Sequence, residues 1–138
     1  MIKTLRVPCE LKHTRTCRQF VTELIHELGL SEEEIFKIQL AVGEASSNAI
    51  DHGAVCDEKK EVEISCTVSE KKLIISVRDW GGKSFNPSFF ESLANKKSRI
   101  WREGGHGIQL IVQMMDEVIY IFHPNHTTTL CMVKYLPN

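Results

Sequence analysis

The chain has 138 residues, 42% of them hydrophobic and 25% charged, with a formal net charge of −1 at pH 7. This composition is typical of one compact globular domain and argues against general binders of nucleic acid and against disordered chains. No apolar run has the length of a membrane span, and the segment MIKTLRVPCE turns polar at once, so we expect neither a signal peptide nor contact with a membrane.

The first two elements predicted along the chain are a strand and a helix. Side chains alternate over residues 2–7, which predicts a strand that ends at Pro8. Apolar residues at helical spacing then predict a helix over about 13–29, with Gly29 as its C-cap.

A second helix has the clearest sequence signals. Ser31 and Glu34 stand three residues apart and form a capping box. The helix that they open is expected to end at Gly53. Its predicted buried face consists of Ile35, Ile38, Val42, Ala45 and Ala49.

The second half of the chain predicts two hairpins separated by a long loop and a helix. The expected strands and helix, in chain order, are about 61–68, 72–79, 107–116 (the helix), 118–122 and 127–136. The segment SEKK makes the first turn. Residues 80–106 contain four glycines and one proline, with one short helix expected near 88–93. Such a long loop is usually functional.

The five cysteines are odd in number and include no CxxC pair. We therefore expect reduced thiols and a cytoplasmic location. A zinc site built from His52 or His106 with scattered cysteines stays open as an alternative, which the spacing does not favour.

Three short segments combine polar residues with element boundaries. Glu44, Asn48 and His52 recur at four-residue spacing, which places them in a column on one helix face. DWGG, residues 79–82, ends a predicted strand, and GGHG, residues 104–107, opens a predicted helix. Each segment alone is more often a solvated face or a turn. Their occurrence in this order around one long basic loop favours a shared site.

The chemistry of the three segments is that of a nucleotide site. Free N–H groups in a glycine turn at a helix N-terminus bind phosphate. An aspartate that leaves a strand into glycines can bind a base or sugar close to the backbone. An asparagine oxygen suits Mg²⁺, and a carboxylate one turn away can orient a nucleophile or accept its proton.

With these motifs the chain resembles the GHKL ATPase superfamily and, within it, the bacterial anti-sigma-factor serine kinases. LAVGEASSNAIDHG is similar to the N-box of that branch, VRDWGGKSFNP and GGHGIQLIVQMMDEV to its two glycine boxes, and TTTLCMVKYL to its terminal strand. The resemblance runs from about residue 8 to the end. It implies an α/β fold with two layers, in which helices cover one face of a mixed, mostly antiparallel sheet, over a single domain, 1–138.

The resemblance also implies residue roles on the helix and the first glycine box. Glu44 would be the general base or orient water, and Asn48 would bind Mg²⁺. Asp79 would bind the adenine amino group, with Gly81 allowing close approach. His52 could help to shape the nucleotide site, although a histidine that favours the helix dipole is at least as common.

The remaining implied roles concern phosphate, adenine and a lid. Gly105 and Gly107 would cradle the phosphates, and Thr128 or Thr129 would back the adenine. Residues 83–104 would form an ATP lid. Lid cations able to reach the γ-phosphate are Lys96, Lys97, Arg99 and Arg102. Departures from the family pattern in this region are Lys83 after the paired glycines, Asn86 where aspartate is common, and one extra residue before FNP.

The resulting hypothesis is an ATP- and Mg²⁺-dependent serine/threonine protein kinase that acts as an anti-sigma factor. Its implied partners are a small antagonist protein as substrate, a sigma factor and a second copy of the chain. An alternative is an ATP-binding module that captures partners without phosphotransfer. A piece of a two-component histidine kinase is disfavoured, because no helical hairpin with an acceptor histidine precedes the domain.

Overall fold

The computed structural model describes residues 2–53, 60–80, 105–123 and 127–137. Its strands are β1 (Ile2–Pro8), β2 (Glu61–Ser69), β3 (Lys72–Asp79), β4 (Glu117–His123) and β5 (Thr127–Tyr135). Its helices are α1 (Thr14–Ile25), which follows a 3₁₀ turn at Leu11–His13, α2 (Glu32–Gly53) and α4 (Gly105–Met114).

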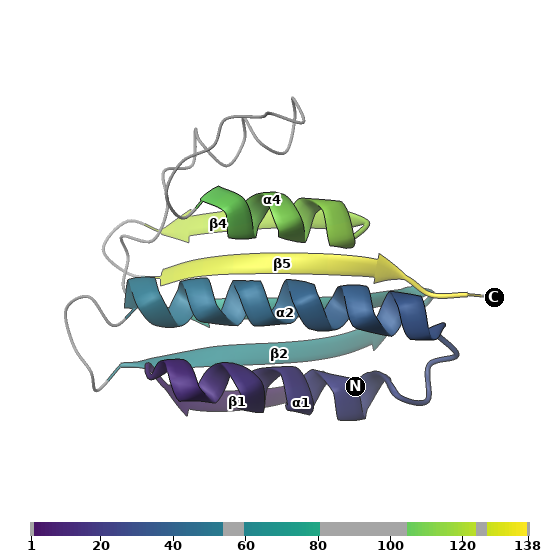
Figure 1. Ribbon diagram of the computed structural model, residues 1–138, viewed down its shortest axis with the longest axis horizontal. Coiled ribbons are helices and arrows are strands. Elements are labelled where there is room, and N and C mark those ends of the chain that lie inside the picture. The colour runs from purple at the N-terminus through teal and green to yellow at the C-terminus, as the bar shows by residue number, and fades with distance from the viewer. Residues whose placement is uncertain (1, 54–59, 81–104, 124–126, 138) are drawn as a thin grey trace.

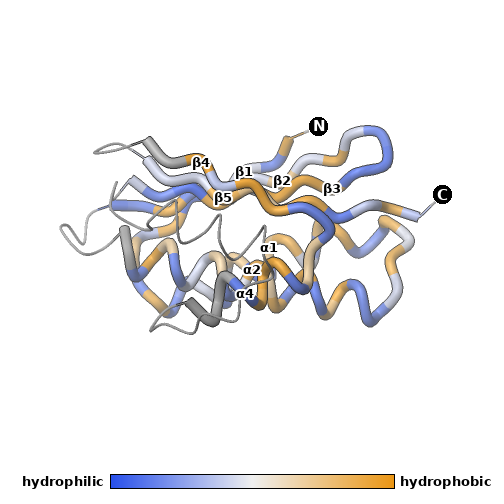
Figure 2. The backbone as a smooth tube through the Cα atoms, turned by 90° about the horizontal axis from the view of Figure 1, so that it is seen from above, coloured by the Kyte–Doolittle hydropathy of each residue, from blue (hydrophilic) through white to orange (hydrophobic). Residues whose placement is uncertain are grey.

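These elements form two layers. The five strands lie in the order β1-β2-β3-β5-β4, and every described pair is antiparallel. All three helices cover one face of this sheet, with α2 between α1 and α4 (Figures 1 and 2). The predicted two-layer α/β fold with helices on one face is confirmed, and the sheet, expected to be mixed but mostly antiparallel, is antiparallel in every described pair.

Helix α2 begins and ends where its sequence predicts. The Glu34 N–H donates to the Ser31 hydroxyl at 3.1 Å, which is one half of the capping box. Three glutamates in the first turn favour the positive end of the helix dipole. The apolar residues of the helix with exposures of 5% or less are Ile38, Ala41, Val42, Ala45, Ala49 and Ile50.

The other two helices differ from prediction at their ends. Helix α1 ends at Ile25, and Gly29 lies in the following turn with φ of +77°, a conformation that glycine adopts without strain. Helix α4 begins and ends two residues earlier than expected. It ends early because the Asp116 N–H already donates to the Val133 carbonyl at 2.9 Å and so joins the chain to the sheet.

The inner face of the sheet forms the core against α2. In β3 the residues Leu73, Ile75 and Val77 are at most 2% exposed, and each alternates with a more exposed neighbour. The alternation continues to Asp79, which is also 2% exposed. A charged residue therefore occupies the last core position of this strand.

Among the described residues, no helix is both long and apolar enough to cross a membrane. Four described cysteines are free, and burial raises the pKa of the Cys66 thiol to about 11. No group of three or more potential metal ligands occurs in that part of the chain.

Candidate functional site

The residues singled out in the sequence gather at one end of the sandwich. The register pairs Asp79, at the end of β3, with Thr128, near the start of β5. Strand β4 ends at the same edge, where Phe122 pairs with Thr128. Helix α2 ends and α4 begins at this end as well, which lies on the left in Figure 1. We call it the site end.

Asp79 and Thr128 lie on the helix-covered face of the sheet. Paired residues of antiparallel strands point to the same face, and the two side chains are 2% and 3% exposed. The Thr128 hydroxyl oxygen is buried and has no hydrogen-bond partner among the described residues. A buried hydroxyl without a partner is costly, so this position favours a ligand.

Thr129 occupies the other face of the sheet, because successive residues of a strand alternate. Its hydroxyl accepts a hydrogen bond from Arg78 Nε at 3.1 Å. Of the two threonines considered from the sequence, Thr128 is therefore the one on the face of Asp79.

Glu44 and Asn48 lie on the part of α2 that faces away from α1. The α1 side of the helix is marked by Gln39, whose Nε2 donates to the Thr22 hydroxyl at 3.0 Å. It is also marked by Gly43, where a Cβ would lie 3.0 Å from Arg18 Cδ. Positions five residues later are rotated by about 140° around the helix. Glu44 and Asn48 are thereby turned toward α4, the neighbour of α2 on its other side (Figure 1).

The side-chain amide of Asn48 has an unbonded hydrogen-bonding group. Its Nδ2 atom is buried and has no hydrogen-bond partner among the described residues. Amide groups are nearly always bonded when buried. Asn48 and Thr128 thus present unpartnered polar atoms from the helix layer and the sheet layer at the site end.

The N-terminus of α4 adds backbone N–H groups to this end. Gly105 and Gly107 both belong to its first turn, which contains no acidic side chain. The first N–H groups of a helix have no partner within the helix, and its dipole favours anions there. The role of the two glycines in phosphate binding stays a prediction.

Several residues predicted from the sequence are not among the described residues. Gly81 and the expected lid, 83–104, with its four cations and the short helix near 88–93, lie outside the described residues. His52 is in the last turn of α2, but its side chain and that of His106 are not described. The roles assigned to them stay predictions.

Contacts around Trp80 are absent from the sequence-based picture. Lys60 Nζ donates to the Trp80 carbonyl at 3.2 Å, and the Arg6 guanidinium lies over the Trp80 ring, 5.2 Å from its centroid. The three residues are distant in the sequence, so no local pattern predicts their contact. The sequence singles out this segment as the DWGG motif but does not reveal these partners.

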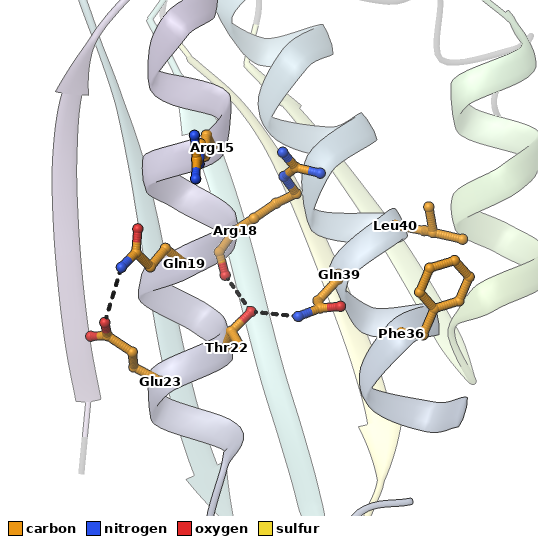
Figure 3. A pocket seen from close by; sticks show the side chains of 8 residues that line it. All are labelled: Arg15, Arg18, Gln19, Thr22, Glu23, Phe36, Gln39 and Leu40. Atoms are coloured by element: carbon orange, nitrogen blue, oxygen red, sulfur yellow. Dashed lines mark hydrogen bonds between the residues drawn. The ribbon is translucent and has the colours of Figure 1, made fainter. Parts of the chain in front are cut away.

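A surface hollow of about 530 Å³ lies on the outer side of α1 and α2. Figure 3 shows its lining residues, Arg15, Arg18, Gln19, Thr22, Glu23, Phe36, Gln39 and Leu40. Thr22 donates to the Arg18 carbonyl at 2.7 Å. None of the predicted nucleotide residues lines this hollow, and no sequence motif points to it.

Curated relatives cover most of the chain. It is 33% identical over 122 residues to the anti-sigma F factor of Bacillus thuringiensis (strain Al Hakam). The aligned region covers 88% of this chain and 83% of the relative. The anti-sigma F factor of Bacillus cereus (strain AH187) matches with the same identity and coverage.

Solved structures share the fold at low sequence identity. A chain in the SiaB–SiaC complex from Pseudomonas aeruginosa superposes with a TM-score of 0.75 at 13% identity, covering 95% of this chain and 88% of that one. The RsbU and RsbW domains of a Mycobacterium tuberculosis protein give a TM-score of 0.68 at 18% identity over 97% of this chain. The chain spans only 32% of that longer protein.

The family comparison agrees with the fold. The sequence profile of the histidine kinase-like ATPase domain matches residues 7–134, from the end of β1 to the end of β5. The match includes the segments that carry Asn48, Asp79 and Thr128. The chain therefore belongs to the family of histidine kinase-like ATPase domains, an ATP-binding family.

Proposed function

We propose that the chain is an Mg²⁺·ATP-dependent serine/threonine protein kinase that acts as an anti-sigma factor and phosphorylates a small antagonist protein. Membership of the ATPase family supports nucleotide binding. The name of the Bacillus relatives, anti-sigma F factor, supports the regulatory role. The observation that carries the proposal is the site end, where buried Asp79 lies beside the unpartnered hydroxyl of Thr128.

The residues at the site end fit ATP. Asp79 is an acceptor for an exocyclic amino group, and the adjacent Thr128 hydroxyl can bond either directly or through water. The N–H groups at the start of α4 can receive phosphate oxygens without competition from an acidic side chain. Adenine and phosphate would thus be held by different layers of the sandwich.

Asn48 fits a magnesium ligand. The two ends of its amide exchange positions when the group rotates by 180°. The amide oxygen can therefore take the buried position at which Nδ2 has no partner. Mg²⁺ prefers oxygen ligands and keeps several waters, so one protein ligand of this kind is sufficient.

Glu44 is the proposed general base. It lies one helical turn before Asn48 on the same face and is half-buried. Its carboxylate would orient the acceptor hydroxyl and take up the proton of that hydroxyl as the new bond to phosphorus forms. ATP would supply the phosphoryl group, ADP would leave as the bond between the γ-phosphorus and the bridging oxygen breaks, and Mg²⁺ would supply most of the charge neutralisation. Asp79 and Thr128 would hold the adenine ring in place throughout.

The names of the similar proteins support a role in protein–protein regulation. The SiaB–SiaC structure is a complex of two proteins, and the RsbU and RsbW domains belong to one larger protein. For this chain we propose an antagonist protein as substrate, a sigma factor as target, a homodimer as the working state and the cytoplasm as location. The domain is proposed to span 1–138, with a lid at 83–104.

The second candidate function is partner capture by an ATP-binding module without phosphotransfer. Asn48 and Asp79 alone are sufficient for such a module, because both serve binding. Glu44 distinguishes the two candidates, since a pure binder has no need for a base beside the metal ligand.

The nucleotide-binding part of the proposal is tested by Asp79→Asn. Loss of one charge-assisted hydrogen bond should weaken binding of Mg·ATP by about 1.5–3 kcal/mol, as measured by isothermal titration calorimetry. Asp116→Asn is the matched control at the opposite end of the sandwich, where Asp116 Oδ2 accepts from the Tyr135 N–H at 2.7 Å. Its affinity should equal that of the wild type. No heat from the wild-type chain with Mg·ATP would refute the proposal.

A further inference from the structure

The outer face of the sheet, opposite the helices, carries a group of contacts directly behind Asp79. Trp80 follows Asp79 and is half-buried on this face. The Arg6 guanidinium of β1 lies 5.2 Å from the centroid of its ring. Lys60, the residue before β2, donates from Nζ to the Trp80 carbonyl at 3.2 Å. We call Arg6, Lys60 and Trp80 the outer anchor.

The anchor connects three segments of the chain at the end of one strand. Arg6 is itself fixed by Glu63 of β2, whose Oε2 lies 2.8 Å from Arg6 Nε. The side chain of Glu63 is 17% exposed and that of Arg6 is 56% exposed, so the pair orients Arg6 from its less exposed partner. A small hollow of about 210 Å³ is lined by Arg6, Lys60, Glu61 and Trp80. The exit of β3 is therefore held from the side of β1 and β2.

The position of the anchor matters because strand ends fray. Residues at the end of a strand open with a low free energy unless further contacts hold them. Asp79 is the last residue of β3, and its side chain points to the helix face. The hydrogen bond from Lys60 to the Trp80 carbonyl and the contact of Arg6 with the Trp80 ring restrict the backbone next to Asp79. Pre-organised groups bind a ligand at a lower entropic cost.

We propose that the outer anchor positions Asp79 for nucleotide binding, with Trp80 as the positioning residue. Trp80 does not touch the ligand in this proposal and acts only through the backbone of its neighbour. The inference rests on the proposed function, because it assumes that Asp79 binds the nucleotide base.

A similar contact at the other end of the same face provides a matched control. Lys72 Nζ lies over the Tyr135 ring, 5.7 Å from its centroid. This pair also joins neighbouring strands, β3 and β5. It differs from the outer anchor in its distance from Asp79, since Lys72 and Asp79 are the two ends of β3.

The experiment compares Trp80→Leu, Trp80→Phe and Tyr135→Leu in the full chain. We expect Trp80→Leu to weaken Mg·ATP binding about 2- to 5-fold in calorimetry, the range that one exposed cation–π contact supports. Trp80→Phe keeps an aromatic face for Arg6 and should bind within about 2-fold of the wild type. Tyr135→Leu should leave nucleotide affinity unchanged, whatever its effect on the melting temperature.

Amide hydrogen exchange measured without nucleotide makes the test independent of catalysis. In Trp80→Leu the Asp79 amide should exchange about 2- to 5-fold faster, while Tyr135→Leu leaves it unchanged. Unchanged affinity and unchanged exchange in Trp80→Leu would each overturn the inference and leave the proposed function intact. A wild-type chain that binds no nucleotide would overturn both.

Discussion

The two ends of the sandwich differ in whether their buried polar atoms have hydrogen-bond partners. At the end away from the site, Lys134 is only 6% exposed, and its Nζ donates to the Met114 carbonyl at 2.7 Å. At the site end, Asn48 Nδ2 and Thr128 Oγ1 are buried without a partner among the described residues. Among the described residues, buried Lys134 is therefore bonded within the chain at one end, whereas Asn48 and Thr128 keep unbonded polar atoms at the other.

This difference separates stability from function along the length of one domain. The bond from Lys134 satisfies a carbonyl at the C-terminus of α4, where helices have carbonyls without partners. The atoms left open at the site end have an energetic cost in the free protein. A ligand that bonds them recovers that cost on binding. Substitutions at the site end should therefore change ligand binding, and substitutions at the opposite end should change the free energy of unfolding.

The strongest test of the site end is Glu44→Gln. The change keeps the shape of the side chain and removes its charge, so nucleotide affinity should stay near normal. Transfer of phosphate to the antagonist should fall by about 10²–10⁴, the usual contribution of a general base. The rate is measured by a single-turnover assay with labelled ATP. A wild-type rate would mean that Glu44 only solvates the helix, and the kinase assignment of this residue would have to be abandoned.

The next test concerns the opposite end. Lys134→Met keeps the aliphatic stem and leaves the Met114 carbonyl without its donor. The free energy of unfolding should drop by about 1.5–3 kcal/mol, measured by urea titration. Calorimetry on the folded variant should give wild-type affinity for Mg·ATP. A large loss of affinity at full stability would show that the two ends are not independent.

The smallest expected effect, and the sharpest contrast, comes from Thr128→Val. Removal of an unpartnered buried hydroxyl should raise the free energy of unfolding by about 1 kcal/mol while nucleotide affinity falls. Thr129→Val is the control on the same strand, where the hydroxyl accepts from Arg78. That change should reduce stability slightly and leave affinity unchanged. If Thr128→Val destabilises the chain, its hydroxyl is not an open position.

The sequence predicts the parts of this molecule that depend on local signals. Helix α2 follows from the capping box at Ser31 and the apolar stripe, and both described hairpins follow from alternation. The motif residues come together because their elements begin or end at the same edge of the sheet. The sequence places Asp79 at the end of a strand, whereas its burial on the core face is a finding of the structure.

Long-range contacts are the part that the sequence does not reveal. The ring of Trp80 meets Arg6 only because β1 pairs with β2 and β2 with β3. The early end of α4 depends likewise on Val133, which receives the Asp116 N–H. The choice between Thr128 and Thr129 required the register of β5 with β3. Periodicity gives the face of a strand but not the partner across it.

The absence of a side chain at Gly43 determines where the Arg18 side chain lies on the outer surface of the helix layer. The Arg18 side chain reaches across α2 at this glycine, as Figure 3 shows for its guanidinium, and a methyl group there would come within 3.0 Å of Arg18 Cδ. Alanine would gain helix propensity of about 1 kcal/mol but displace a long, flexible cation. A single small residue thus sets where one positive charge stands on the surface, while the core and the site end stay as they are.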